Sequence, residues 1–245
     1  MVKRLSLLAI FASLLLVGGC GGGGASSNTK PHVLFINASA DAGAVDFRLD
    51  DDVQATNLSY AVSNGAFADI DYRGPEVDGW DVSLHLNAGG TEIDREAIIF
   101  GQDVDNIIIA HGIRNFGTEQ LKRLRFSNFA VDLTRPNGNK AKLIVFHGFE
   151  LEAGSDTPQV TFKTPGDNAL FTTPAIDPGS NSVLNTDSGN LTFEARRSGT
   201  QGIYTTVTKN LKAGGVYLVL ISGIENDPTP ANDITIRFIE LPSKL

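Results

Sequence analysis

Two stretches about 110 residues apart decide the fold: IIIAHGI at residues 107–113 and YLVLISGI at residues 217–224. Each is a short apolar run that ends near a glycine, and neither shows the 3.6-residue period of an amphipathic helix. A run of this length, bounded by turn residues, is typical of a buried β-strand. The pair therefore indicates a β-fold in which a strand-rich unit occurs twice.

The segments around these two runs repeat with the same offset of 110 to 115 residues. Short alternating or apolar runs with Gly, Asn and Asp between them indicate strands, and a period of this size fits an immunoglobulin-like sandwich. We predict an all-β fold of two tandem immunoglobulin-like antiparallel β-sandwiches at residues 32–136 and 140–245, with a single large barrel as the alternative. The matching segments are 33–38 with 143–148, 45–48 with 160–163, 82–86 with 191–195, and 124–126 with 234–238.

The N-terminus resembles the signal peptide of a bacterial lipoprotein. Lys3 and Arg4 precede an apolar run at 5–17, and Gly18 and Gly19 precede Cys20, as in a lipobox. Thirteen residues span about 20 Å as a helix, too short for a bilayer core of about 30 Å. We expect cleavage after residue 19 and lipidation of Cys20, with an uncleaved anchor or an ordinary secretory signal as alternatives.

Residues 20–31 are expected to form the lipidated end and a flexible Gly/Ser tether. The tether has a root-mean-square reach of about 18 Å. The residue after the cysteine is Gly21 rather than Asp, which by resemblance to Gram-negative lipoproteins favours sorting to the outer membrane. The predicted localisation is therefore the outer membrane, with the folded part within tether reach of the lipid surface.

Composition excludes several classes of function. Without Lys3 and Arg4 the mature chain carries a net charge of −10, which disfavours nucleic acid as a partner. Cys20 is the only cysteine, so once lipidated it leaves no thiol for a disulfide, a redox pair or a cysteine-rich metal site. No cofactor is expected.

Residues 37–46, NASADAGAVD, resemble the opening motif of the family catalogued as domain of unknown function 4397. That motif usually reads His-Ala-Ser-Pro-Asp-Ala-Pro-Ala-Val-Asp. In this chain Asn37 replaces the His, and Ala40 and Gly43 replace the two prolines. Residues 57–60 and the strand ending at Gly112 also resemble the family. The resemblance covers about 32–125 well and the second half faintly. It implies tandem, anchored extracytoplasmic domains and no agreed activity.

Charge is distributed unevenly along the chain. Residues 33–113 have a net charge of −12, residues 114–142 of +5 and residues 143–245 of −4. One interpretation is that basic residues contact the acidic first module, so that high salt would separate the two modules. The other is a soluble acidic surface with a basic inter-module seam. The basic residues considered for this contact are six of the seven in residues 114–142: Arg114, Lys122, Arg123, Arg125, Lys140 and Lys142.

Candidate metal ligands lack the spacing of known sites. Asp50, Asp51 and Asp52 form an acidic turn, but three consecutive side chains cannot all point at one ion, so a solvated hairpin turn is expected. Residues 93–96 and 225–228 are similar to calcium-binding segments of cadherins but fall in different repeats. The histidines, expected to be ordinary surface or hydrogen-bonded residues, are His32, His85, His111 and His147. No metal site is predicted.

The chain carries no nucleophile motif such as Gly-x-Ser-x-Gly or His-Glu-x-x-His. Tyr60, Tyr72 and Trp80 could form a platform for sugars, although core packing is expected of Trp80. Residues 164–190 are predicted to be a long polar loop, the most specialised element of the chain.

These observations predict a non-enzymatic binding or envelope-structural module. Its partner would be an envelope protein or a glycan, bound by loops at one end of a sandwich. The alternative is an envelope or polysaccharide hydrolase that uses carboxylates of the first repeat, for example Asp69 with Asp71. The second sandwich could also serve only as a spacer. No ligand-binding residue or oligomeric state is assigned.

Overall fold

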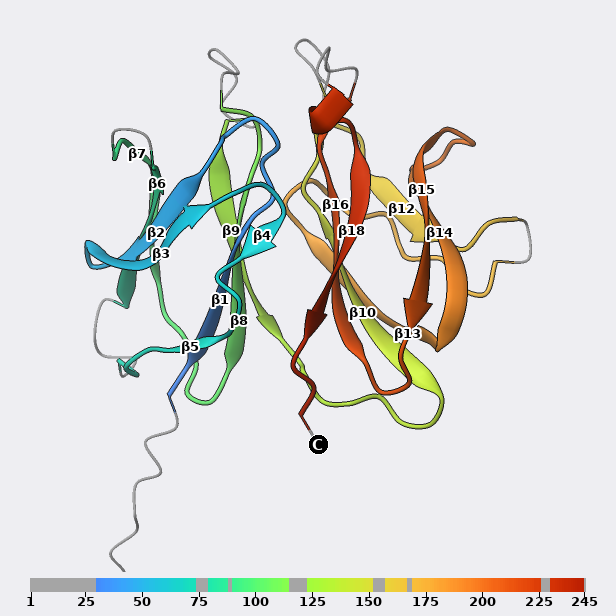
Figure 1. Cartoon of the computed structure of the whole chain (residues 1–245), viewed down its shortest axis with the longest axis horizontal. Helices are drawn as coiled ribbons and strands as arrows, with labels where there is room; N and C mark the ends of the chain where they lie inside the picture. The colour runs from blue at the N-terminus through green and yellow to red at the C-terminus, as the bar shows by residue number, and fades with distance from the viewer. Residues whose placement is uncertain are drawn as a thin grey trace, which may run out of the picture.

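The computed structural model describes residues 30–73, 79–87, 90–114, 123–151, 157–166, 169–225 and 230–244 (Figure 1). The predicted signal peptide, Cys20 and all but the end of the predicted tether lie outside these residues. Apart from a 3-10 turn at Pro230–Asn232, every regular element is a β-strand in this part of the chain. No helix that is long and apolar enough to cross a bilayer occurs among the described residues.

The first sandwich is built from strands that alternate between buried and exposed positions or are buried throughout. Its strands are β1 (His32–Asn37), β2 (Val45–Leu49), β3 (Asp52–Leu58), β4 (Val62–Ser63), β5 (Ala68–Asp69), β6 (Trp80–Leu86), β7 (Glu92–Ile98), β8 (Asp105–His111) and β9 (Arg125–Val131). One sheet has the order β4-β1-β8-β9, with β5 also paired to β1, and the other has the order β3-β2-β6-β7.

The second sandwich follows β9 after a connection at residues 132–139. Its strands are β10 (Lys140–His147), β11 (Glu150–Leu151), β12 (Val160–Lys163), β13 (Asn181–Asp187), β14 (Gly189–Arg197), β15 (Ile203–Leu211), β16 (Val216–Ser222), β17 (Ile224–Glu225) and β18 (Thr235–Leu241). One sheet has the order β13-β10-β16-β18 and the other β12-β14-β15, and β11 pairs with β17.

The inner sheets of the two sandwiches share one strand order and one register in their central pairs. Leu34 of β1 lies opposite Ile107 of β8, and about 110 residues later Ile144 of β10 lies opposite Leu218 of β16. The predicted all-β class and the tandem sandwiches are confirmed. One detail is corrected: both of these central pairs run parallel, whereas the sandwiches were predicted to be antiparallel. Between the two strands the chain crosses to the other sheet and back twice, and this route returns it in the same direction.

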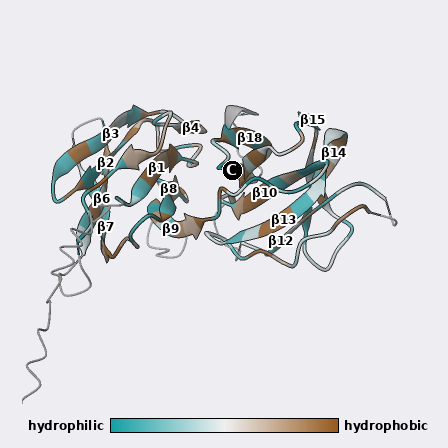
Figure 2. Cartoon of the chain, turned by 90° about the horizontal axis from the view of Figure 1, so that it is seen from below, coloured by the Kyte–Doolittle hydropathy of each residue, from teal (hydrophilic) through white to brown (hydrophobic). Residues whose placement is uncertain are grey.

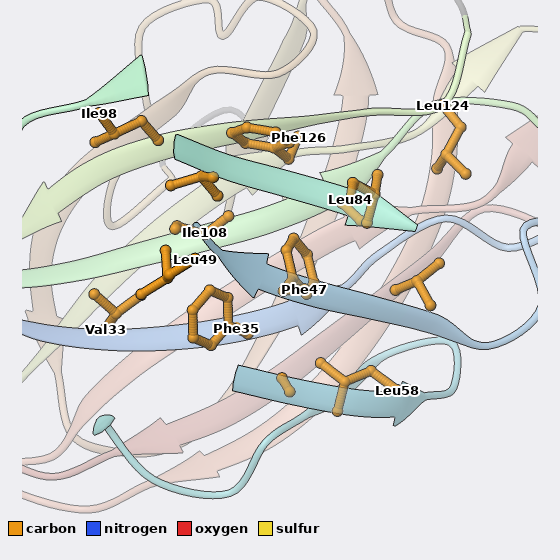
Figure 3. Packing of buried hydrophobic residues seen from close by; sticks show 14 of the residues in the cluster. Val33, Phe35, Phe47, Leu49, Leu58, Leu84, Ile98, Ile108, Leu124 and Phe126 are labelled. Atoms are coloured by element: carbon orange, nitrogen blue, oxygen red, sulfur yellow. The ribbon is translucent and has the colours of Figure 1, made fainter. Parts of the chain in front are cut away.

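The central strands are buried on both faces, which explains their continuous apolar sequence. In β1, Val33 and Phe35 enter the core of the first sandwich, while Leu34 and Ile36 face the second sandwich. Figure 3 shows Val33 and Phe35 packed with the apolar residues of the opposite sheet, including Phe47. In β2, by contrast, only alternate residues are buried, because its sheet has an apolar core on one side only.

The sheets containing β1 and β10 face each other and enclose an apolar layer, here called the central layer. Figures 1 and 2 show these two inner sheets side by side, with the β2 and β14 sheets on the far sides. The molecule is therefore a stack of four sheets with three apolar layers between them. The buried residues of the central layer are Leu34, Ile36, Ala38, Ile107, Ile109, Leu133, Ile144, Phe146, Val216, Leu218, Leu220 and Leu241.

The prediction of a long polar loop at residues 164–190 is wrong from residue 181 onward, whereas the described residues of 164–180 form no strand beyond isolated bridges at Thr172 and Ile176. The segment contains β13, which forms antiparallel pairs with β10 from Asp187 opposite Lys140 to Asn181 opposite Phe146. The sequence of β13, NSVLNTD, is polar because β13 is an edge strand whose side chains are mostly half-buried or exposed. Pairing with a buried neighbour stabilises it as a strand despite its weak local preference.

Candidate functional site

The carboxyl ends of the four central strands meet at one edge of the stack, here called the far edge. They carry the polar residues Asn37, His111, His147 and Ser222 at the ends of β1, β8, β10 and β16, and all four are fully buried. Asn37 and His147 occupy equivalent positions in the two repeats, as do His111 and Ser222. Buried polar groups at strand ends require partners. Asn37 and His147 find theirs within their own repeat, whereas Ser222, and His111 through Ser127, are linked to the other sandwich.

Hydrogen bonds at the far edge run between the repeats in both directions. The Ser127 hydroxyl of β9 donates to the Gly179 carbonyl of the second sandwich at 2.9 Å. In the reverse sense, the Tyr60 hydroxyl of the first sandwich lies 3.0 Å from Ser222 Oγ and 3.3 Å from Thr235 Oγ1. A loop from each repeat therefore caps the inner sheet of the other.

Their hydrogen bonds assign the tautomers of the two buried histidines. Because Ser127 gives its proton to Gly179, His111 Nε2 must donate to Ser127 Oγ, 2.8 Å away. His147 Nδ1 must likewise donate to the Ile176 carbonyl at 2.9 Å. His111 Nδ1 and His147 Nε2 are left as buried acceptors, without a hydrogen-bond partner in the part of the chain that the structure describes.

Burial lowers the pKa of both imidazoles. The pKa of His111 falls from 6.5 to about 3 because of burial and, secondarily, the positive charges of Arg125 and His147. The pKa of His147 falls to about 4, chiefly through burial, although the bond to Ile176 and the charge of Asp177 oppose the shift. The unfolded chain takes up protons near pH 6.5 and the folded chain does not, so the free energy of unfolding falls as the pH drops from 6.5 toward 4.

This edge is consequently a structural site whose chemistry is limited. Neutral imidazoles with such low pKa values are poor general bases near pH 7. Among the described residues, no three His, Cys, Asp or Glu side chains form a cluster that could hold a metal ion. The remaining predicted histidines lie elsewhere: His32 Nδ1 is 3.0 Å from Asp105, and His85 contacts Ser83 Oγ and the Gly90 carbonyl.

The basic seam does not hold the sandwiches together. Among the described members of the seam, Arg125 alone reaches across, with Nη2 3.7 Å from Oε1 of the buried Glu150. The other members have partners within their own repeat or the connection, and Lys122 lies outside the described residues. Arg123 lies 3.7 Å from Asp94, Arg114 N–H donates to Asp41, Lys140 pairs with Asp187 and Lys142 pairs with Asp132. Among the described residues, the ion pairs between the repeats are Arg125 with Glu150 and Lys244 with Asp105. The larger contact is the apolar burial of the central layer, which joins the modules.

The acidic turn at Asp50, Asp51 and Asp52 is bound by arginines. Asp50 and Asp51 both adopt positive φ, and their carboxylates pair with Arg73 and Arg95, respectively. Arg95 also binds Asp81 and Glu92, and its hydrogen bonds lower the pKa values of Asp51 and Glu92. Carboxylates held apart by guanidinium groups do not converge on one ion.

Of the cadherin-like segments, Asp94 in residues 93–96 accepts the Phe126 N–H at 3.1 Å. Residues 226–228 of the second segment lie outside the described part of the chain. The carboxylate of Asp94 therefore has a structural partner in the first repeat.

The three aromatic residues of the suggested sugar platform lie apart. Trp80 lies at the start of β6, where its Nε1 donates to the Asp71 carbonyl at 3.0 Å and the Arg73 guanidinium stacks on its ring at 3.7 Å. Tyr60 lies at the far edge between the repeats, and Tyr72 is 37 % exposed. A common aromatic platform is therefore not formed.

A pocket that sequence analysis did not single out lies on the outer face of the second sandwich. It has a volume of about 290 Å³ and is lined by Thr161, Lys163, Arg196, Arg197, Gly199, Thr200 and Gln201. The signal in the sequence is the adjacent pair Arg196-Arg197 before a Ser-Gly-Thr turn. Lys163 joins this pair only through the pairing of β12 with β14.

Comparisons with known proteins add no identification. No family model matches the chain, and no curated protein matches it. One solved structure with some likeness is titled as a putative cell adhesion protein from Bacteroides ovatus; it is 10% identical, with 89% of this chain and 99% of that chain covered and a TM-score of 0.23. The fold assignment rests on the strand pairing described above.

Proposed function

We propose that this chain is a lipid-anchored extracytoplasmic binding module without catalytic activity of its own, attached to the outer membrane through Cys20. We also propose that its two repeats belong to the family of domain of unknown function 4397. Its partner would be an envelope protein or a glycan. One observation carries the binding proposal: the described chain begins at the edge of the stack opposite the far edge, here called the entry edge. A tether attached at the entry edge would leave the far edge directed away from the membrane.

The position of the entry edge follows from three contacts. Lys30, the first described residue, binds Asp71 at 2.7 Å, and β1 then runs from His32 to Asn37 at the far edge. Lys244 near the other end binds Asp105, which is paired with His32, at 2.7 Å. Both ends of the described chain therefore lie at one edge, and Figure 1 shows the C-terminus there.

The state of the acidic residues supports a non-enzymatic role. A glycoside hydrolase requires one carboxylic acid with a raised pKa. In the first repeat the resolved shifts go the other way: Lys30 lowers the pKa of Asp71, and Arg95 lowers those of Asp51 and Glu92. These groups are suited to ion pairs rather than to proton donation.

Two experiments test the proposal. Cys20→Ser should move the protein out of the membrane fraction or stall its processing, and a mature-sized variant that stays in the membrane would contradict lipid anchoring.

For binding, a photo-crosslinking amino acid at exposed Arg114, near the far edge, should capture a partner in intact cells. The same group at exposed Asp103, near the entry edge, is the matched control. Equal capture at both sites, or none at Arg114, would contradict the orientation.

Catalysis can be tested separately. Turnover of a cell-wall or polysaccharide substrate that is lost in an acid-to-amide variant such as Asp71→Asn would overturn the non-enzymatic proposal.

A further inference from the structure

The two outer sheets carry opposite charge although they are equivalent in the repeat. The strands β2, β3, β6 and β7 hold six acidic and two basic residues, a formal net charge of −4. The strands β12, β14 and β15 hold four basic residues and one acidic residue, a net charge of +3. In a chain with a net charge of −8, the second outer sheet is a local exception.

The positive charge of this sheet is gathered at the pocket. In β12, Val160 and Phe162 point into the core, so Thr161 and Lys163 point outward. Thr161 lies opposite Arg196 of β14, and the turn from β14 to β15 closes the end of the pocket. Three cationic side chains therefore line one pocket of about 290 Å³, together with two threonines and a glutamine.

The pocket is preorganised, and part of its charge has no carboxylate partner among the described residues. Arg196 is held by Glu194, with Nε 2.7 Å from Oε2, and by Gln201, with Nη1 2.9 Å from Oε1. Lys163 Nζ donates to the Gly166 carbonyl at 2.9 Å, which leaves two of its N–H groups available. Within the described residues, the Arg197 guanidinium has no carboxylate partner. Lys163 and Arg197 thus supply two positive charges that no carboxylate of the described residues neutralises, and an external anion could do so.

We propose that this pocket binds an anionic group, a carboxylate, phosphate or sulfate, carried on a ligand the size of one sugar ring. Guanidinium and ammonium groups form strong charge-assisted hydrogen bonds with such oxyanions. The hydroxyls of Thr161 and Thr200 and the amide of Gln201 suit the hydroxyls of a sugar. The inference rests on the proposed binding function and names its ligand class. Because the whole protein is acidic, an anionic ligand is attracted only close to the pocket. Added salt screens this attraction, so binding weakens as the salt concentration rises.

The test is a calorimetric titration of the full-length protein in non-ionic detergent. The probes are glucuronic acid and glucose 6-phosphate, with glucose as the neutral control. We expect saturable binding of at least one acid and none of glucose, and the two acids distinguish a carboxylate from a phosphate ligand. Lys163→Gln with Arg197→Gln should weaken binding by about tenfold or more.

Lys209→Gln is the matched control, since Lys209 lies on the same sheet but does not line the pocket. Arg196 is left unchanged because its removal would strand the buried Glu194. No binding of either acid, binding of glucose to the same extent, or equal binding by the double variant would overturn the proposal. A flat titration together with specific crosslinking from Arg114 would remove this ligand and leave the binding function intact.

Discussion

Replacing Phe146 with alanine should destabilise both sandwiches, although Phe146 belongs to the second. Its ring is fully buried in the central layer, stacked on Phe129 of the first sandwich at 5.8 Å and edge-on to His111 at 5.5 Å. Removing a buried phenylalanine costs about 3–5 kcal/mol through lost transfer energy and the cavity left behind. With a slope of about 3 kcal/mol per M urea, the unfolding midpoint falls by about 1 M or more.

Trp80 makes the test specific. It is the only tryptophan and lies in the first sandwich, so its fluorescence reports unfolding of that sandwich alone. Far-UV circular dichroism reports both. If the central layer makes the four sheets one cooperative unit, the two probes give coincident curves in the wild type and both shift in Phe146→Ala.

Ile203, an exposed residue of the second sandwich, provides the control for this test. Ile203→Ala removes a side chain that is 48 % exposed and should change the free energy of unfolding by less than about 0.5 kcal/mol. A Trp80 transition that stays in place in Phe146→Ala, while circular dichroism splits into two steps, would refute the reasoning. The sandwiches would then unfold independently, and the central layer would contribute little.

Three further predictions follow from the same structure. Because apolar burial joins the sandwiches, the radius of gyration from X-ray scattering should stay the same between low and high salt; expansion at high salt would restore the electrostatic interpretation. In urea titrations, the free energy of unfolding of the wild type should fall from pH 7 to pH 5 as the unfolded state binds protons. The double variant His147→Asn with His111→Ser carries the residues found at the equivalent positions of the other repeat, and it should reduce that fall. An unchanged fall would exclude the histidines as its cause. Gly223→Ala should cost about 2 kcal/mol or more in thermal unfolding, because φ is +133° and a Cβ would lie 2.4 Å from the Asp233 carbonyl oxygen, whereas Gly138→Ala, with φ of +67° and open space around it, should cost only about 1 kcal/mol.

The candidate sites were only partly predictable. His111 and His147 stood out as single polar residues at the ends of apolar runs, but nothing local indicates that they share one buried edge. Their place at one edge depends on two strands from different repeats, and their hydrogen bonds depend on loops that carry Ile176 and Gly179. The basic pocket likewise needs the register of β12 against β14, which places Lys163 beside a pair of arginines more than 30 residues away.

The sequence by itself determined the buried strands of each repeat and that they occur twice. Apolar runs and alternating patterns are local consequences of burial on two faces or one, so they can be recognised without knowing what covers each face. Only the tertiary structure decided what covers them. Leu34 and Ile144 look alike in sequence, yet they meet in the central layer because the two inner sheets stack on each other. Strand β13 shows the converse: a polar edge strand depends on its neighbour for its structure, and that neighbour, β10, is supplied by the fold.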